Sequence, residues 1–117
     1  MSNPVRLTFY APSIGAINVG DEVPLPLDVF DVIADALVDP TTLSFFVLSP
    51  DGTSHTYVNG TDAEVERVSV GRFRLTVYAT QAGKWRVVAI VDGNVRGREP
   101  TDFFAYATAA DVEIPPT

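Results

Sequence analysis

The chain has 117 residues, of which 46% are hydrophobic, and this is enough for one domain with a packed core. It has no cysteine, which excludes disulfide bridges and thiolate metal sites. The net charge of −7 disfavours nucleic acid as a partner, and no run approaches the roughly 20 apolar residues of a membrane span. Residues 1–4 lack a basic stretch followed by an apolar run, so we expect no cleaved signal peptide.

The first segment, residues 5–10, alternates apolar and polar side chains and is expected to be a strand. Residues 11–20 carry proline and glycine and indicate a loop or an extended arm. The apolar side chains Ile14, Ile17 and Val19 are unusual in a free linker. They are candidates for contact with a neighbouring subunit, and the alternative is that the segment crosses the edge of its own domain.

The middle of the chain predicts two strands separated by an apolar connection. Residues 23–30 alternate strictly, but Pro24 and Pro26 lack the N–H of a ladder, so this half of the strand should lie at a sheet edge. Residues 32–37 are the one segment that suggests a short helical turn. Residues 43–48 are apolar on both sides, which is typical of a central strand.

The remainder of the chain alternates between strands and turn residues. Asp51-Gly52 and Asp92-Gly93 predict hairpin turns. The expected strands are residues 53–58, 64–68, 72–79, 84–91 and 94–107. Short strands at this spacing predict an all-β, immunoglobulin-like sandwich of about seven or eight antiparallel strands. We divide the chain into an N-terminal strand or arm at 1–20, the sandwich at 21–107 and a C-terminal tail at 108–117.

Three short motifs carry a family resemblance. They are Val38-Asp39-Pro40-Thr41-Thr42-Leu43-Ser44-Phe45 leading to Ser49-Pro50-Asp51-Gly52-Thr53, then Gly71-Arg72-Phe73, then Ala82-Gly83-Lys84-Trp85. Their order and spacing resemble immunoglobulin-like domains of bacterial and phage surface proteins. In particular, they are similar to small proteins encoded among the virion structural genes of tailed phages. The resemblance covers residues 21–107.

This resemblance implies a structural protein of the virion. It implies buried aromatic rings at Phe73 and Trp85, and it implies no catalytic residue and no cofactor. The expected partners are other virion proteins, namely the major capsid protein or neck and tail proteins, with several copies assembled on the particle. The chain departs from the pattern in its apolar stretch 32–38 and in its longer N-terminal segment, and either could hold a contact surface of its own.

Catalytic and metal-binding patterns are weak in this sequence. His55 is the single histidine, and Ser54 beside it should point to the opposite face of a strand, so we expect an ordinary surface histidine. A pair of carboxylates could serve glycoside hydrolysis, but no pocket follows from the sequence. Four acids could supply oxygen ligands for calcium, although no calcium-loop motif is present and solvated turn caps fit better. These acids are Asp28, Asp31, Asp35 and Asp39.

Charge is divided unevenly along the chain. No Lys or Arg lies between Arg6 and Arg67, whereas basic residues outnumber acids from residue 67 to residue 98. We expect the strands 72–79 and 84–91 to pair, which would place four cations on one sheet face. These protein-contact candidates are Arg72, Arg74, Lys84 and Arg86. The face is either merely solvated or binds a partner, for example the acidic half of another copy.

Two classes of function remain. The first is a virion structural protein that decorates or cements the capsid or is otherwise head-associated, with a neck or tail position as the alternative. The second is a carbohydrate- or receptor-binding module that uses exposed aromatic rings. Its candidate platforms are Tyr10, Tyr57, Tyr78 and Phe46. An enzyme is not expected.

Overall fold

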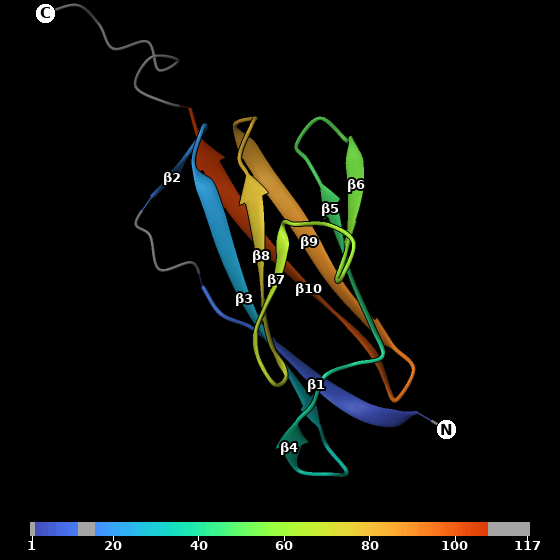
Figure 1. Ribbon diagram of the computed structural model, residues 1–117. Helices are drawn as coiled ribbons and strands as arrows, with labels where there is room; N and C mark the ends of the chain where they lie inside the picture. The colour runs from blue at the N-terminus through green and yellow to red at the C-terminus, as the bar shows by residue number, and fades with distance from the viewer. Residues whose placement is uncertain (1, 12–15, 108–117) are drawn as a thin grey trace, which may run out of the picture.

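The computed structural model describes residues 2–11 and 16–107, which form two β-sheets packed face to face (Figure 1). The strands are β1 Asn3–Phe9, β2 Ile17–Asn18, β3 Glu22–Asp31, β4 Ala36–Leu37, β5 Thr42–Leu48, β6 Ser54–Val58, β7 Val65–Ser69, β8 Arg72–Tyr78, β9 Gly83–Asp92 and β10 Val95–Tyr106. The described residues contain no helix. Accordingly, they offer no helix of the length and apolar character that crossing a membrane requires.

The strand order is that of an immunoglobulin-like sandwich. One sheet runs β1-β3-β8-β7 and the other runs β6-β5-β9-β10, while β4 adds to β3 and β2 adds to β10. The predicted fold class is therefore confirmed. One difference is that β1 joins both sheets: its first two residues pair in parallel with β10 and the rest pairs antiparallel with β3. The short β2 is also parallel to β10, so the sandwich is not purely antiparallel.

The core follows from alternation along the strands. The inward aliphatic side chains of β3 are at most 2% exposed and belong to one core cluster with buried residues of β5, β8 and β9. Phe73 is 2% exposed and Trp85 is 5% exposed, as the sequence motifs imply. The Trp85 ring stacks on Phe103 with centroids 5.8 Å apart, and its Nε1–H donates to the carbonyl oxygen of Gln81 at 3.0 Å.

The prolines of β3 lie at an open edge, as predicted. The segment that contains Pro24 and Pro26 pairs with β8 on one side, whereas β1 ends at Phe9 and covers only the later half of β3. The N–H of Tyr10 donates to the carbonyl oxygen of Pro26 at 3.0 Å, so the missing proline N–H groups face the side where the ladder stops.

The helical turn expected at residues 32–37 is present only as one α-turn, in which the N–H of Asp35 donates to the carbonyl oxygen of Asp31 at 2.8 Å, and no helix follows. Residues 32–35 form a tight turn, and the chain then returns as β4 to pair with β3. The carboxylate of Asp31 accepts N–H groups from Ile33 and Ala34 at 2.9 and 3.0 Å, which begins a turn like a helix cap. Asp35 then takes a left-handed φ of 57°, and this conformation ends the turn before a helix can propagate.

Both hairpin turns are capped by their own aspartates. Asp51 accepts hydrogen bonds from the hydroxyl of Ser49 and the N–H of Thr53, and these bonds lower the pKa of Asp51 from 3.8 to about 2. Asp92 accepts the N–H of Gly93 and a bond from Arg96, and both lower its pKa. The folded state therefore favours these carboxylates in their ionised form.

We predict that acid destabilises this fold below pH 4. A carboxyl group whose pKa is lower in the folded chain stabilises it above the unfolded pKa of 3.8, and this contribution is lost as the pH falls toward 2. The urea midpoint, followed by the fluorescence of Trp85, should be constant from pH 7 to about pH 5 and decline between about pH 4 and 2. Asp51→Asn should make that decline shallower, and an unchanged midpoint down to pH 2 would contradict the assignment.

Candidate functional site

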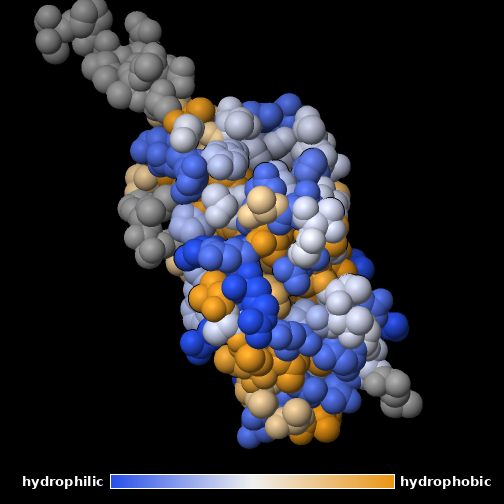
Figure 2. All heavy atoms as spheres, viewed as in Figure 1, coloured by the Kyte–Doolittle hydropathy of each residue, from blue (hydrophilic) through white to orange (hydrophobic). Residues whose placement is uncertain are grey.

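Four exposed aliphatic side chains define a site that we call the apolar tip. They lie on the β3–β4 turn and on the end of β7 with the turn after it, at the end of the sandwich that carries β4, where Figure 2 shows apolar atoms gathered. The members are Val32, Ile33, Val68 and Val70, which are 43%, 68%, 55% and 53% exposed. Exposed aliphatic residues are usually scattered singly over a soluble protein, so a cluster of them indicates a contact surface.

Gly71 brings the two loops of the tip together. Its φ is 69°, and a Cβ built there would lie 2.7 Å from the Cβ of Leu37 and 2.8 Å from the nitrogen of Val38. Its carbonyl oxygen also accepts the N–H of Val29 at 2.7 Å. Only glycine satisfies both the left-handed backbone and this close approach, so the β7–β8 turn is fixed against β4.

Asp39 joins the same loops through its carboxylate. Oδ1 accepts the N–H of Gly71 at 2.9 Å, and Oδ2 accepts the guanidinium of Arg67 at 3.0 Å from Nε. The hydrogen bond from Arg67, followed by that from Gly71, lowers the pKa of Asp39. The carboxylate is therefore charged at neutral pH and links the loop after β4 to the turn after β7.

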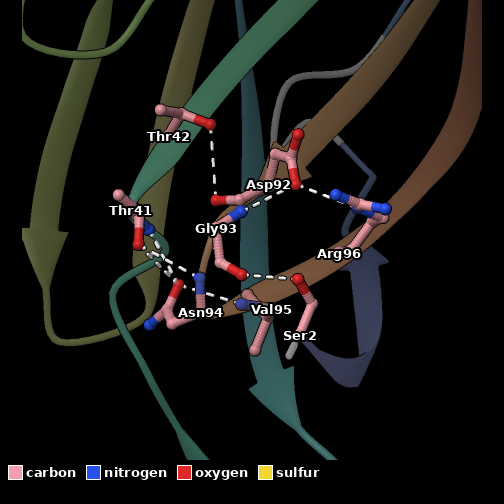
Figure 3. Close-up of polar contacts among 8 residues, drawn as sticks. All are labelled: Ser2, Thr41, Thr42, Asp92, Gly93, Asn94, Val95 and Arg96. Carbon is pink, nitrogen blue, oxygen red and sulfur yellow. Dashed lines mark hydrogen bonds and ion pairs between the residues drawn. The ribbon is translucent and has the colours of Figure 1, made fainter.

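Asn94 bonds the segment between β4 and β5 to the β9–β10 turn, and Figure 3 shows its contacts with Thr41 and Val95. Its Nδ2–H donates to the carbonyl oxygen of Asp39 at 2.9 Å. Its Oδ1 accepts the N–H of Thr41 at 2.8 Å and the N–H of Val95 at 3.0 Å. One side chain in the β9–β10 turn thus holds the segment that crosses between the sheets, which follows β4 in the chain.

The β3–β4 turn is held in the same way by Asp31, which is only 6% exposed. Besides the two N–H groups of the turn, this carboxylate accepts Nδ2–H of Asn3 at 2.9 Å. The N–H of Ala34 is the strongest cause of the lowered pKa of Asp31, followed by Asn3. Val32 and Ile33 are therefore displayed from a hydrogen-bonded turn.

A β-bulge explains how Val68 reaches the surface. The β7–β8 register shifts between Arg67, which pairs with Phe73, and Ser69, which pairs with Arg72. Val68 is the extra residue in this irregularity and points away from the core. The sequence singled out the apolar stretch 32–38 but missed Val68 and Val70, whose one signal is that two valines stand immediately before a turn glycine.

The basic residues do not share one face, which corrects the sequence prediction. β8 and β9 lie in different sheets, because residues 79–82 cross between the sheets and do not close a hairpin. Arg72 pairs with Asp28 and Arg74 pairs with Glu66 on the first sheet, while Lys84 pairs with Asp102 on the second. Within the described ranges, Arg86 is the one member of this set without an ion pair.

The N-terminal contact candidates have separate outcomes. Ile17 is 8% exposed in its own core, where β2 runs beside the end of β10, so its side chain is not presented to a partner. Val19 is half-buried and its N–H donates to the carbonyl oxygen of Tyr106 at 2.8 Å. This part of the segment crosses the edge of its own domain. Ile14 lies outside the described residues.

The remaining candidates occupy different places. Tyr10 donates a hydrogen bond to Asp28 at 2.9 Å, and Phe46 lies half-buried on β5. His55 is exposed, and its ring lies 4.4 Å from that of Tyr57. Within residues 2–11 and 16–107, no three metal-ligating side chains come together. Two of the four acids considered as calcium ligands, Asp31 and Asp39, instead accept backbone N–H groups.

Comparison with known proteins supports the fold. No protein-family model and no curated protein matches the sequence. The chain is similar to a part of the chitinase ChiW of Paenibacillus sp. str. FPU-7, a cell-surface-expressed multi-modular enzyme, with a TM-score of 0.62 and 18% identity over 89% of this chain. It spans 9% of that chitinase chain. It is also similar to the Lin-41 filamin domain, with a TM-score of 0.62 and 18% identity over 85% of this chain and 90% of the other. At this identity the likeness shows an immunoglobulin-like sandwich and no shared activity.

We predict that Gly71→Ala is much more damaging than Gly52→Ala. The first change adds a close contact to a strained backbone and should lower the free energy of unfolding by about 2–4 kcal/mol. Gly52 also has a positive φ, of 91°, but nothing lies within 4 Å of a Cβ there. That control should therefore cost about 1–2 kcal/mol. Urea unfolding measures both, and equal losses would contradict the role of Gly71 in joining the loops.

Proposed function

We propose that this protein is a non-catalytic structural protein of a phage particle and that it docks onto other virion proteins through the apolar tip. The observation that carries the docking site is the exposure of four aliphatic side chains on loops that are hydrogen-bonded in place. A free loop would lose conformational entropy on binding, whereas these loops are already ordered, so more of the apolar contact energy is available for association.

The chemistry of the tip defines the partner surface. The tip offers aliphatic groups at its centre, with Asp39 and Arg67 already paired beside them. A complementary partner therefore has an apolar pocket with a polar rim and no need for an opposing charge. Binding through such a surface should depend weakly on salt, unlike the electrostatic contact that the sequence suggested.

The virion setting is supported by the three sequence motifs, not by the structural comparisons. The solved structures described above contribute the sandwich alone, and immunoglobulin-like domains carry many functions. Within this proposal the protein decorates or cements the capsid or sits elsewhere on the head, with a neck or tail position as the alternative, and several copies assemble on one particle. Arg86 stays a candidate for contacts between copies, because its guanidinium makes no ion pair with residues 2–11 and 16–107.

The test is sedimentation with particles of the phage that encodes the protein, prepared without their own copy of it. Wild-type protein should co-sediment with the particles at a fixed copy number. The double variant Ile33→Ser and Val68→Ser should bind at least about tenfold more weakly, because each buried aliphatic side chain contributes roughly 1.5–3 kcal/mol. The unfolding midpoint of this variant should change little, since both side chains are exposed.

Val58→Ser is the matched control for this experiment. Val58 is an exposed aliphatic residue on β6, outside the tip, and is 39% exposed. Its variant should bind like the wild type. Equal binding by the tip variant would exclude the tip as the docking site, and absence of wild-type protein from the sedimented particles would contradict the virion proposal itself.

A further inference from the structure

A groove opens between the two sheets on the side that carries β6 and β8. It has a volume of about 450 Å³, within the usual range of small-molecule sites. The groove exists because β7 is short: Val65 pairs with Leu75, and the last contact of this edge is the N–H of Thr76 with the carbonyl oxygen of Glu64. Past that point the described residues supply no strand on the β7 side of β8, so the groove reaches down to core residues.

The floor and walls of the groove are apolar and aromatic. Val47, Val77 and Trp85 form the floor, and all three are core residues that are at most 5% exposed. Tyr57 lines the groove from β6, and Tyr78, which is 50% exposed and has its phenol beside Glu22, borders it from β8. The site therefore presents aromatic rings from both sheets.

The rim of the groove is polar. Hydroxyl, imidazole and amide groups line it, and no Asp, Glu, Lys or Arg is among the described lining residues. Burial raises the pKa of Tyr57, and the carboxylate of Glu22 raises that of Tyr78, so both phenols keep their protons at neutral pH. An anionic ligand would find no Lys or Arg among the described lining residues to compensate for its desolvation.

Several rim groups keep hydrogen-bonding capacity. Within residues 2–11 and 16–107, the side chains of Ser54, His55 and Thr80 make no hydrogen bond. Gln81 uses its Oε1 to accept the N–H of Asp51 at 3.1 Å, and its amide also bonds the Asp51 carboxylate, which fixes the side chain at the rim. Directional donors and acceptors thus surround a floor of ring faces.

We propose that this groove binds a neutral carbohydrate, with one hexose ring stacked on an aromatic wall and its hydroxyls bonded to the polar rim. A hexose has an apolar C–H face and hydroxyl groups around its ring. The first matches the aromatic lining of the groove, and the second match the hydrogen-bond donors and acceptors of its rim. An apolar peptide would leave the rim groups unpaired, and an anionic sugar would meet no cation. This site shares no residue with the apolar tip, so either proposal can be contradicted without the other.

The experiment titrates the protein with four neutral probes, which are cellohexaose, maltohexaose, laminarihexaose and N-acetylchitohexaose. Trp85 is the single tryptophan and lies in the groove floor, so its fluorescence reports binding, and calorimetry confirms it. At least one probe should bind with a saturable signal. Tyr78→Ala should weaken that binding by about tenfold, the effect of losing one aromatic contact. Gln81→Ala should weaken it as well, because a donor is lost.

Tyr10→Ala is the matched control, because Tyr10 is 49% exposed on the opposite edge of the fold. It should bind the probe like the wild type, and so should the Ile33→Ser and Val68→Ser tip variant. No binding of any neutral probe would overturn the proposal. Unchanged binding by Tyr78→Ala, or tighter binding of heparin oligosaccharide than of every neutral probe, would also overturn it.

Discussion

The loop structure at the end of the sandwich that carries β4 depends on the hydrogen bonds of Asp39. Its carboxylate accepts the N–H of Gly71 and the guanidinium of Arg67, while its carbonyl oxygen accepts the side chain of Asn94. One residue in the segment between β4 and β5 therefore holds the turn of one sheet and the hairpin of the other. Because the backbone there must cross between sheets without a ladder, side chains replace the missing backbone partners. The tip can expose aliphatic groups since its backbone is held in this way.

The two proposed surfaces lie in different parts of the fold and use different physics. At the tip, ordered loops display aliphatic side chains that the fold leaves exposed, which suits a protein partner with an apolar pocket. At the groove, β7 is too short to cover the edge of β8. Trp85 and two tyrosines therefore line an opening with a polar rim. A domain with both could attach by one end and still present a binding groove, and a variant of one surface should leave the other intact.

Much of the fold follows from the sequence, because burial with a period of two is a local property. The alternation in residues 72–79 and 84–91 predicts two half-buried strands, and Pro24 and Pro26 predict an open edge. Which strands pair is not a local property, because the same turn residues can close a hairpin or lead from one sheet to the other. The predicted pairing of β8 with β9, and with it the shared basic face, is therefore wrong. The bulge at Val68 likewise depends on strand pairing, and the left-handed Asp35 stands in a turn that contains no glycine to indicate it. Of the apolar tip, only the stretch that contains Val32 and Ile33 could therefore be predicted.

The claim that the tip is rigid is tested most directly by amide hydrogen exchange. The N–H of Gly71 is bonded to Asp39 and that of Val38 is bonded to the carbonyl oxygen of Val29 at 3.0 Å. Both amides should exchange as slowly as core amides of β9, such as that of Val87, because opening them requires global unfolding. Exchange of Gly71 and Val38 at rates typical of an unstructured peptide, while Val87 stays protected, would contradict the account.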